Sequence, residues 1–188
     1  MSQINLNRHA ACSASENTGR PKGRLNMTAL VLYYSNTGNT QKVAKALAEQ
    51  LGADLAEITC QTYLAWYGPL AMAWDIFTRH RPKVSVVAPK DARYDLVVVG
   101  GPVWAAHVAP PVLSALRMLP SADATAIFVT CRGTSPNSPP DPALAEMQAA
   151  TPAPVIASRI FREEEIRGPS LSEKIADLAA GLKARASA

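Results

Sequence analysis

The sequence is poor in cysteine and has no long apolar run. Its three cysteines, Cys12, Cys60 and Cys131, lie far apart and form no C-x-x-C pair. This spacing excludes a disulfide framework and gives no support to a zinc site. No stretch approaches the roughly eighteen apolar residues that a membrane-spanning helix needs, and the N-terminus lacks the apolar middle section of a secretion signal. We therefore expect a cytoplasmic protein without a membrane partner.

The part of the chain that is expected to fold, residues 28–188, also lacks a large net charge. Most of the formal net charge of +4 belongs to residues 1–27, which hold four basic residues and one acidic residue. The remainder is close to neutral and has no Lys/Arg cluster with interleaved aromatic residues, so a nucleic-acid partner is not expected. Residues 1–27 are polar and unpatterned, and we expect a disordered leader there. A targeting peptide is the alternative for this segment.

Strand and helix patterns alternate from residue 28 onward. The segment 39–52 places Val43, Leu47 and Leu51 on one helical stripe and ends at Gly52, a typical C-terminal stop. The continuous apolar run 94–104 is typical of a parallel strand buried on both faces. The alternation predicts one α/β domain at 28–188, with a three-layer, doubly wound, five-stranded parallel sheet. The expected strands are 29–35, 53–60, 94–104, 125–131 and 154–161, and the expected helices are 39–52, 109–119, 141–151 and 171–184.

The first strand ends in SNTGNT, residues 35–40, six small uncharged residues that lead directly into a helix. Parallel sheets bind ligands at the carboxyl ends of their strands, and a helix that begins there offers free N–H groups. Three hydroxyls add donors, and Gly38 lets the backbone curl around an oxyanion. The turn has neither the Gly-Lys-Ser/Thr ending of a triphosphate loop nor G-x-G-x-x-G spacing. It therefore predicts a metal-free site for one terminal phosphate. The alternative is that the turn only caps the helix and binds no ligand.

The S-x-T-G-N-T pattern resembles the phosphate loop of the flavodoxin family, whose members hold the phosphate of FMN in this way. Residues 100–105 (GGPVWA) and 131–137 (CRGTSPN) resemble the two loops of that family that enclose the flavin ring. The resemblance covers nearly all of residues 28–186 and implies FMN as cofactor and the strand order 2-1-3-4-5. It assigns the phosphate to Ser35, Asn36, Thr37, Gly38, Asn39 and Thr40, and the ring to Pro102, Val103, Trp104, Ala105, Cys131, Arg132, Gly133 and Thr134.

Several of these residues admit a second interpretation. Trp104 is expected to contact the flavin, with a core or interface tryptophan as the alternative. His107 is expected to be a loop histidine, and a proton donor is the alternative. Cys131 is expected to be a small buried hydrophobe. Arg132 departs from the family pattern, which the resemblance implies often has neutral or acidic groups at this place. A cation facing the ring would stabilise reduced flavin, and the alternative is an arginine in solvent.

Residues 60–90 are longer than a simple link between strands and are rich in aromatic residues. We expect an insertion whose helix covers the sheet edge, with a lid or partner surface as the alternative. The basic run 79–83 is typical of a solvated helix end, and binding of a nicotinamide cofactor's phosphate is the alternative.

The expected function is that of an FMN-dependent oxidoreductase or electron-transfer protein, in which the flavin carries the chemistry. No catalytic side chain is assigned. An NAD(P)H-dependent quinone reductase is one alternative, and a cofactor-free interaction module with the same fold is another. The expected partner is a redox protein or a small-molecule electron acceptor, with NAD(P)H as a candidate donor. The sequence identifies neither donor nor acceptor, and it does not indicate the oligomeric state.

Overall fold

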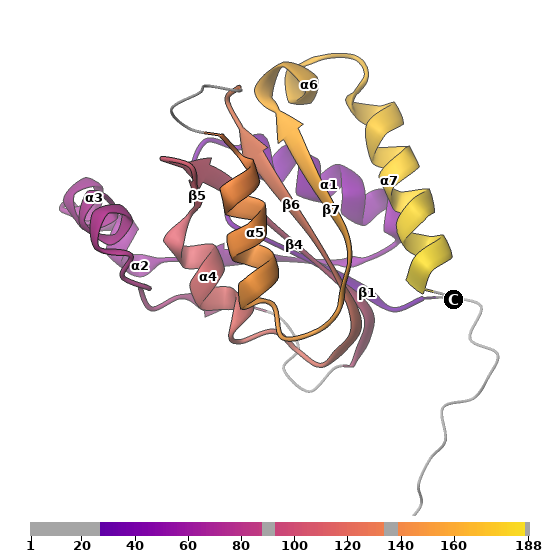
Figure 1. Ribbon diagram of the computed structural model, residues 1–188, viewed down its shortest axis with the longest axis horizontal. Coiled ribbons are helices and arrows are strands. Elements are labelled where there is room, and N and C mark those ends of the chain that lie inside the picture. The colour runs from indigo at the N-terminus through magenta and orange to yellow at the C-terminus, as the bar shows by residue number, and fades with distance from the viewer. Residues whose placement is uncertain (1–26, 88–92, 134–138, 187–188) are drawn as a thin grey trace, which may run out of the picture.

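The computed structural model describes residues 27–87, 93–133 and 139–186 (Figure 1). Residues 1–26 of the expected leader, the end of the expected insertion at 88–90, and Thr134 lie outside these ranges. Among the described helices, none combines the length and apolar character that a bilayer span requires.

In the described residues, seven strands form one sheet. They are β1 Ala29–Tyr33, β2 Asp54–Thr59, β3 Ser85–Val86, β4 Tyr94–Trp104, β5 His107–Val108, β6 Ala122–Cys131 and β7 Val155–Arg162. The order is β3-β2-β1-β4-β6-β7, and β5 pairs with β4. The strands β2, β1, β4, β6 and β7 are mutually parallel, whereas β3 and β5 pair antiparallel with β2 and β4. The predicted five-stranded parallel sheet of order 2-1-3-4-5 is thus confirmed, with two short strands that the sequence did not predict.

Helices cover both faces of this sheet, as the layers in Figure 1 show. The described helices are α1 Asn39–Leu51, α2 Gln61–Leu64, α3 Gly68–Thr78, α4 Pro110–Leu116, α5 Asp141–Ala150, α6 Glu163–Arg167 and α7 Leu171–Ala186. α1 and α7 pack on one face, and α4 and α5 pack on the other. The sequence did not predict α6, which follows β7 directly and lies near the start of α1.

Alternating side chains of the central strands supply two separate cores. Val31 and Val98 point toward α1 and α7, whereas Leu32 and Val99 point toward α4 and α5. Successive strand residues face opposite sides of a sheet. Because both sides are covered by helices, the strand β4 needs an uninterrupted apolar sequence, as its pattern predicted.

Two adjacent glycines in β4 are explained by close packing. A Cβ atom added to Gly100 would lie 2.0 Å from Cζ of Phe128, and one added to Gly101 would lie 2.5 Å from Cγ2 of Val112. The ring of Phe128 is itself fixed edge-on against Phe161, with 5.9 Å between the ring centroids. The core therefore excludes any side chain at these two positions.

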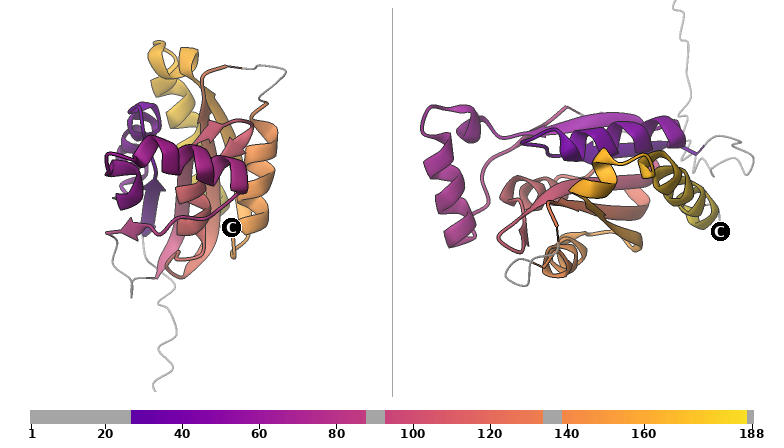
Figure 2. Two further views of the ribbon diagram at one scale, coloured as in Figure 1. Left: turned by 90° about the vertical axis from the view of Figure 1, so that its left-hand side faces the viewer. Right: turned by 90° about the horizontal axis from the view of Figure 1, so that it is seen from above.

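The insertion between β2 and β4 forms α2, α3 and β3. Ser85 and Val86 of β3 pair with the end of β2, so a strand extends this edge of the sheet. Figure 2 shows α2 and α3 in purple and magenta, projecting beyond the sheet as an arm. Arg79, which follows α3, reaches Glu146 on α5. This corrects the expectation of a helix covering the sheet edge.

Candidate functional site

The turn between β1 and α1 leaves the start of the helix open. Gly38 takes a left-handed backbone with φ of 87°, and its N–H donates to Oγ of Ser35 over 3.1 Å. Among the residues that the structure describes, no side chain caps α1. Its first turn carries no acidic residue, and Asn36, Thr37 and Gly38 are exposed. A helix N-terminus without a capping side chain presents N–H groups and a positive dipole end to an anion.

The side chain of Thr40 makes a hydrogen bond inside the protein. Its side chain is buried, and its Oγ1 lies 2.7 Å from Oγ1 of Thr130 near the end of β6. This hydrogen bond ties the turn after β1 to the strand that carries the second predicted ring loop. The two predicted loops therefore open at the same edge of the sheet with a fixed spacing.

The short helix α6 brings a carboxylate to this edge that sequence reasoning missed. Oε1 of Glu163 accepts a hydrogen bond from Nδ2 of Asn39 over 3.4 Å and pairs with Arg167 at 2.6 Å. Oε2 of the same residue lies 3.8 Å from Nε of Arg132, whose side chain is 95% exposed. The structure therefore places Arg132 in solvent beside α6, which is the alternative that the sequence left open.

Strand β4 runs into a tight hairpin that contains the predicted ring contacts. Trp104 pairs with His107 across the turn, and the two residues between them, Ala105 and Ala106, have φ values of 48° and 67°. A two-residue hairpin turn with both φ values positive normally uses glycine or asparagine. Each alanine costs about 1–2 kcal/mol in this conformation. Strain of this kind is often found where a backbone is held in place for a ligand.

Trp104 belongs to an aromatic cluster. Its ring lies edge-on to Tyr34, with centroids 5.8 Å apart, and tilted against Tyr63 at 6.4 Å. Burial, with Cys60 and Glu57 close by, raises the pKa of Tyr34 to about 12. Tyr63 comes from α2 in the insertion and was not predicted as a site residue; only the aromatic content of the insertion could have indicated it. The cluster fixes the ring of Trp104 at the carboxyl edge.

Cys131 ends β6 and is partly buried. Burial raises the pKa of its thiol, although the charge of Arg162 acts in the opposite direction. A protonated thiol is a weak nucleophile, so the residue is suited to packing rather than to covalent chemistry. Among the described residues, no group of His, Cys, Asp and Glu side chains is arranged to hold a metal ion.

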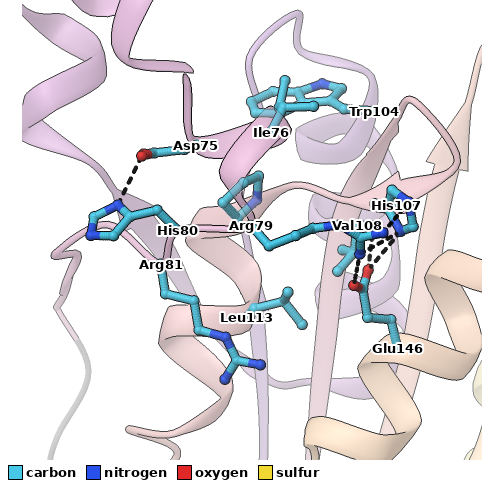
Figure 3. A pocket seen from close by; sticks show the side chains of 11 residues that line it. Asp75, Ile76, Arg79, His80, Arg81, Trp104, His107, Val108, Leu113 and Glu146 are labelled. Atoms are coloured by element: carbon cyan, nitrogen blue, oxygen red, sulfur yellow. Dashed lines mark hydrogen bonds and ion pairs between the residues drawn. The ribbon is translucent and has the colours of Figure 1, made fainter. Parts of the chain in front are cut away.

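A pocket lined in part by Trp104 lies between α3, β5, α4 and α5 (Figure 3). Its volume is about 60 Å³. Nη1 of Arg79 donates to Glu146 over 2.8 Å, and the guanidinium lies 2.7–3.0 Å from the ring nitrogens of His107. The apolar part of the wall is formed by Ile76, Trp104, Val108, Pro110 and Leu113.

The four basic residues after α3 are all exposed, as expected, and two of them also pair with carboxylates. Arg79 is paired with Glu146, and Nδ1 of His80 lies 2.8 Å from the buried carboxylate of Asp75. Arg81 lines the pocket and is exposed, as is Lys83. Two of these four residues thus hold the arm in place rather than presenting charge to a ligand.

These features define the class of the protein: an α/β protein with an open helix start and an aromatic hairpin side by side at the carboxyl edge of a parallel sheet. The sequence pattern of the family described as Flavodoxin matches residues 28–161 of this chain. The chain belongs to the flavodoxin family, as its resemblance to that family predicted.

Solved structures agree with this fold. A flavoprotein from Lactobacillus acidophilus in complex with FMN is 23% identical with a TM-score of 0.58, and the match covers 73% of this chain and 95% of that one. The apo-form of the flavoprotein from the same organism is 26% identical with a TM-score of 0.55, over 77% and 98%. Oxidised flavodoxin 2 from Bacillus cereus is 15% identical with a TM-score of 0.53, over 84% and 99%. No curated protein sequence matches.

Proposed function

We propose that the chain binds FMN at the carboxyl edge of its sheet and acts in electron transfer. The observation that carries this proposal is the uncapped start of α1 behind the exposed turn of Asn36, Thr37 and Gly38. Such a turn suits a phosphate held by neutral donors. The solved flavoprotein from Lactobacillus acidophilus in complex with FMN supports the choice of ligand.

The residues of this chain have distinct parts in holding that cofactor. The turn of residues 35–40 would hold the phosphate through its backbone N–H groups and its exposed side chains, and residues 102–105 and the backbone of residues 131–133 would lie against the ring. The Thr40–Thr130 hydrogen bond fixes the distance between the phosphate turn and the end of β6. The packing of Tyr34 and Tyr63 on Trp104 keeps the hairpin in place. When bound, FMN supplies one- and two-electron redox chemistry, and the protein supplies position and shielding.

Titration of the apo-protein with FMN, followed by flavin fluorescence, tests this proposal. Asn36→Asp adds a negative charge to the exposed turn without changing its size, and we expect it to weaken FMN binding at least about tenfold by repulsion of the phosphate. Gln148→Glu is the matched control, because Gln148 is exposed on α5, far along the chain from the turn. We expect this control to bind FMN like the unmodified chain.

Either of two results would contradict the proposal. Absence of FMN binding would favour the cofactor-free interaction module. Equal weakening by both substitutions would show that net charge, rather than the turn, governs the affinity.

A reductase acting on a small molecule is the second candidate, and the pocket beside Trp104 favours it. Apolar walls and the Arg79–His107–Glu146 cluster line this pocket, which shares Trp104 with the proposed ring site (Figure 3). Anaerobic mixing of the FMN-loaded protein with NADH or NADPH, followed by addition of a quinone, tests this candidate. Rapid loss and return of the flavin colour would support it. Lack of reduction by either nucleotide would favour a redox partner protein in the cytoplasm instead.

A further inference from the structure

Helix α3 has apolar side chains on both of its sides. Ala71, Met72 and Ile76 lie on the half-buried side that faces the body of the protein. Leu70, Trp74 and Phe77 lie on the opposite side and are 75%, 65% and 86% exposed. We call these three residues the outer face. A helix with apolar side chains on both sides is normally buried, and among the described residues nothing covers the outer face.

Two exposed apolar residues that precede α3 add to this apolar surface. Leu64 and Trp66 are 74% and 91% exposed. Together with the outer face they expose roughly 800 Å² of mainly apolar surface, taking 150–250 Å² for each large aromatic side chain. This area exceeds the largest apolar patch of a typical monomer, which is about 300–600 Å². It equals the area of about 800 Å² that each partner contributes to a standard stable interface.

The arm is held in place by polar contacts on its inner side. The carboxylate of Asp75, which is 5% exposed, accepts a hydrogen bond from Tyr63 over 2.9 Å and pairs with His80 at 2.8 Å. Arg79 joins the end of α3 to Glu146. The outer face is therefore presented outward by a fixed arm, which Figure 2 shows standing clear of the layers.

We propose that the outer face is the interface of a symmetric dimer, in which α3 packs antiparallel on α3 of a second copy of this chain. The spacing i, i+4, i+7 of Leu70, Trp74 and Phe77 is the pattern by which two helices pack along one stripe. In an antiparallel pair, Trp74 lies on the two-fold axis and Leu70 meets the partner's Phe77. The surface is thus complementary to itself, as a two-fold interface requires.

The charges at the end of the arm favour the antiparallel arrangement. Arg81 and Lys83 follow α3 and are exposed. A parallel pair would bring four like charges together, whereas an antiparallel pair places them at opposite ends. Each basic end then lies beside the turn that carries the partner's Trp66, where a cation can pack on an aromatic face. A helix that lies on a membrane instead carries Lys and Arg along its polar side, and the inner side of α3 carries Asp75 and packs on the protein.

Size-exclusion chromatography with light scattering on the full chain tests the dimer. We expect the unmodified chain to be a dimer at micromolar concentration, and we expect Phe77→Glu to raise the dissociation constant at least about a hundredfold, because it places a carboxylate in an apolar interface. Val87→Glu is the matched control, because Val87 is 85% exposed but lies outside the outer face. We expect this control to remain dimeric.

Leu70→Glu provides a second variant, and circular dichroism and FMN titration accompany each measurement. Folded, FMN-binding monomers in both outer-face variants would support the dimer and would leave the proposed function untouched. A monomeric unmodified chain, or a dimer that survives both substitutions, would overturn the inference. Co-sedimentation of a monomeric chain with phosphatidylglycerol vesicles, lost in Phe77→Glu, would also overturn it and would identify a membrane as the cover.

Discussion

Replacing Gly100 by alanine distinguishes two reasons why glycine stands at this position in the stretch GGPVW, residues 100–104. The resemblance to the flavodoxin family places these glycines at the start of a flavin loop, whereas the structure shows Gly100 against the ring of Phe128. The new Cβ atom would lie 2.0 Å from Cζ of that ring, although ordinary contacts between carbon atoms are about 3.5–4.0 Å. The ring has little room to move because Phe161 packs edge-on against it. Both phenylalanines are fully buried.

We expect this overlap to cost about 3 kcal/mol of unfolding free energy, the upper part of the usual range for overpacking. With a urea m-value of about 1–3 kcal/mol/M, the midpoint of unfolding falls by about 1–3 M. Gly181→Ala is the control, because Gly181 lies in α7 with open space around its Cβ position. We expect this substitution to stabilise the protein by about 0.5–1 kcal/mol.

A double-mutant cycle with Phe128→Leu identifies the clash. Phe128→Leu alone leaves a gap in the core and should cost about 1–2 kcal/mol. In the double variant the smaller side chain leaves room for the new methyl group, so the combined loss should fall short of the sum of the two by at least about 1 kcal/mol. Additive losses, or a Gly100→Ala variant as stable as the original chain, would refute the packing explanation.

Two further predictions concern the hairpin and α6. Ala105→Gly should raise the unfolding free energy by about 0.5–1 kcal/mol, because glycine adopts a φ of 48° without strain. The control Ala145→Gly, at an exposed position of α5, should lower it by about 1 kcal/mol in the same urea titration. Burial opposes ionisation of Glu165, but the Arg162 N–H and the ammonium of Lys174 together hold the pKa of this carboxyl below its ordinary value. The ionised Glu165 therefore stabilises the fold above the unfolded-state pKa of about 4.3, and this contribution is lost as the pH falls below that value. In urea titrations at several pH values, Glu165→Gln should be less sensitive to acid than the original chain, and an unchanged pH profile would contradict this assignment.

The core elements of the fold were predictable because their signals are local. The stripe of Val43 and Leu47 predicted α1, and the left-handed Gly52 ends it as expected. The apolar run of β4 predicted a strand buried on both faces. The strand order came from the resemblance of residues 35–40 to a family loop, because hydrophobic periodicity carries no information about which strands are neighbours.

The short elements were not predictable, since their stability depends on contacts with distant residues. The strands β3 and β5 have two residues each, too few for a periodic pattern, and they exist only because β2 and β4 offer edges to pair with. Helix α6 has five residues, and the N–H of Arg162 is bound by Glu165 at its start. Such elements depend on tertiary contacts rather than on propensity.

The parallel α/β sheet and the uncharged turn at the end of its first strand could be predicted from the sequence, because that turn is a run of six consecutive residues. What each side chain of the site does depends on tertiary contacts. Folding turned Thr40 inward to Thr130, 90 positions away, and placed Arg132 outward beside Glu163. It also joined Tyr63 of the insertion to Trp104. The direction of a side chain is set by the nearest partners in space, and these partners come from distant parts of the chain that only folding brings together.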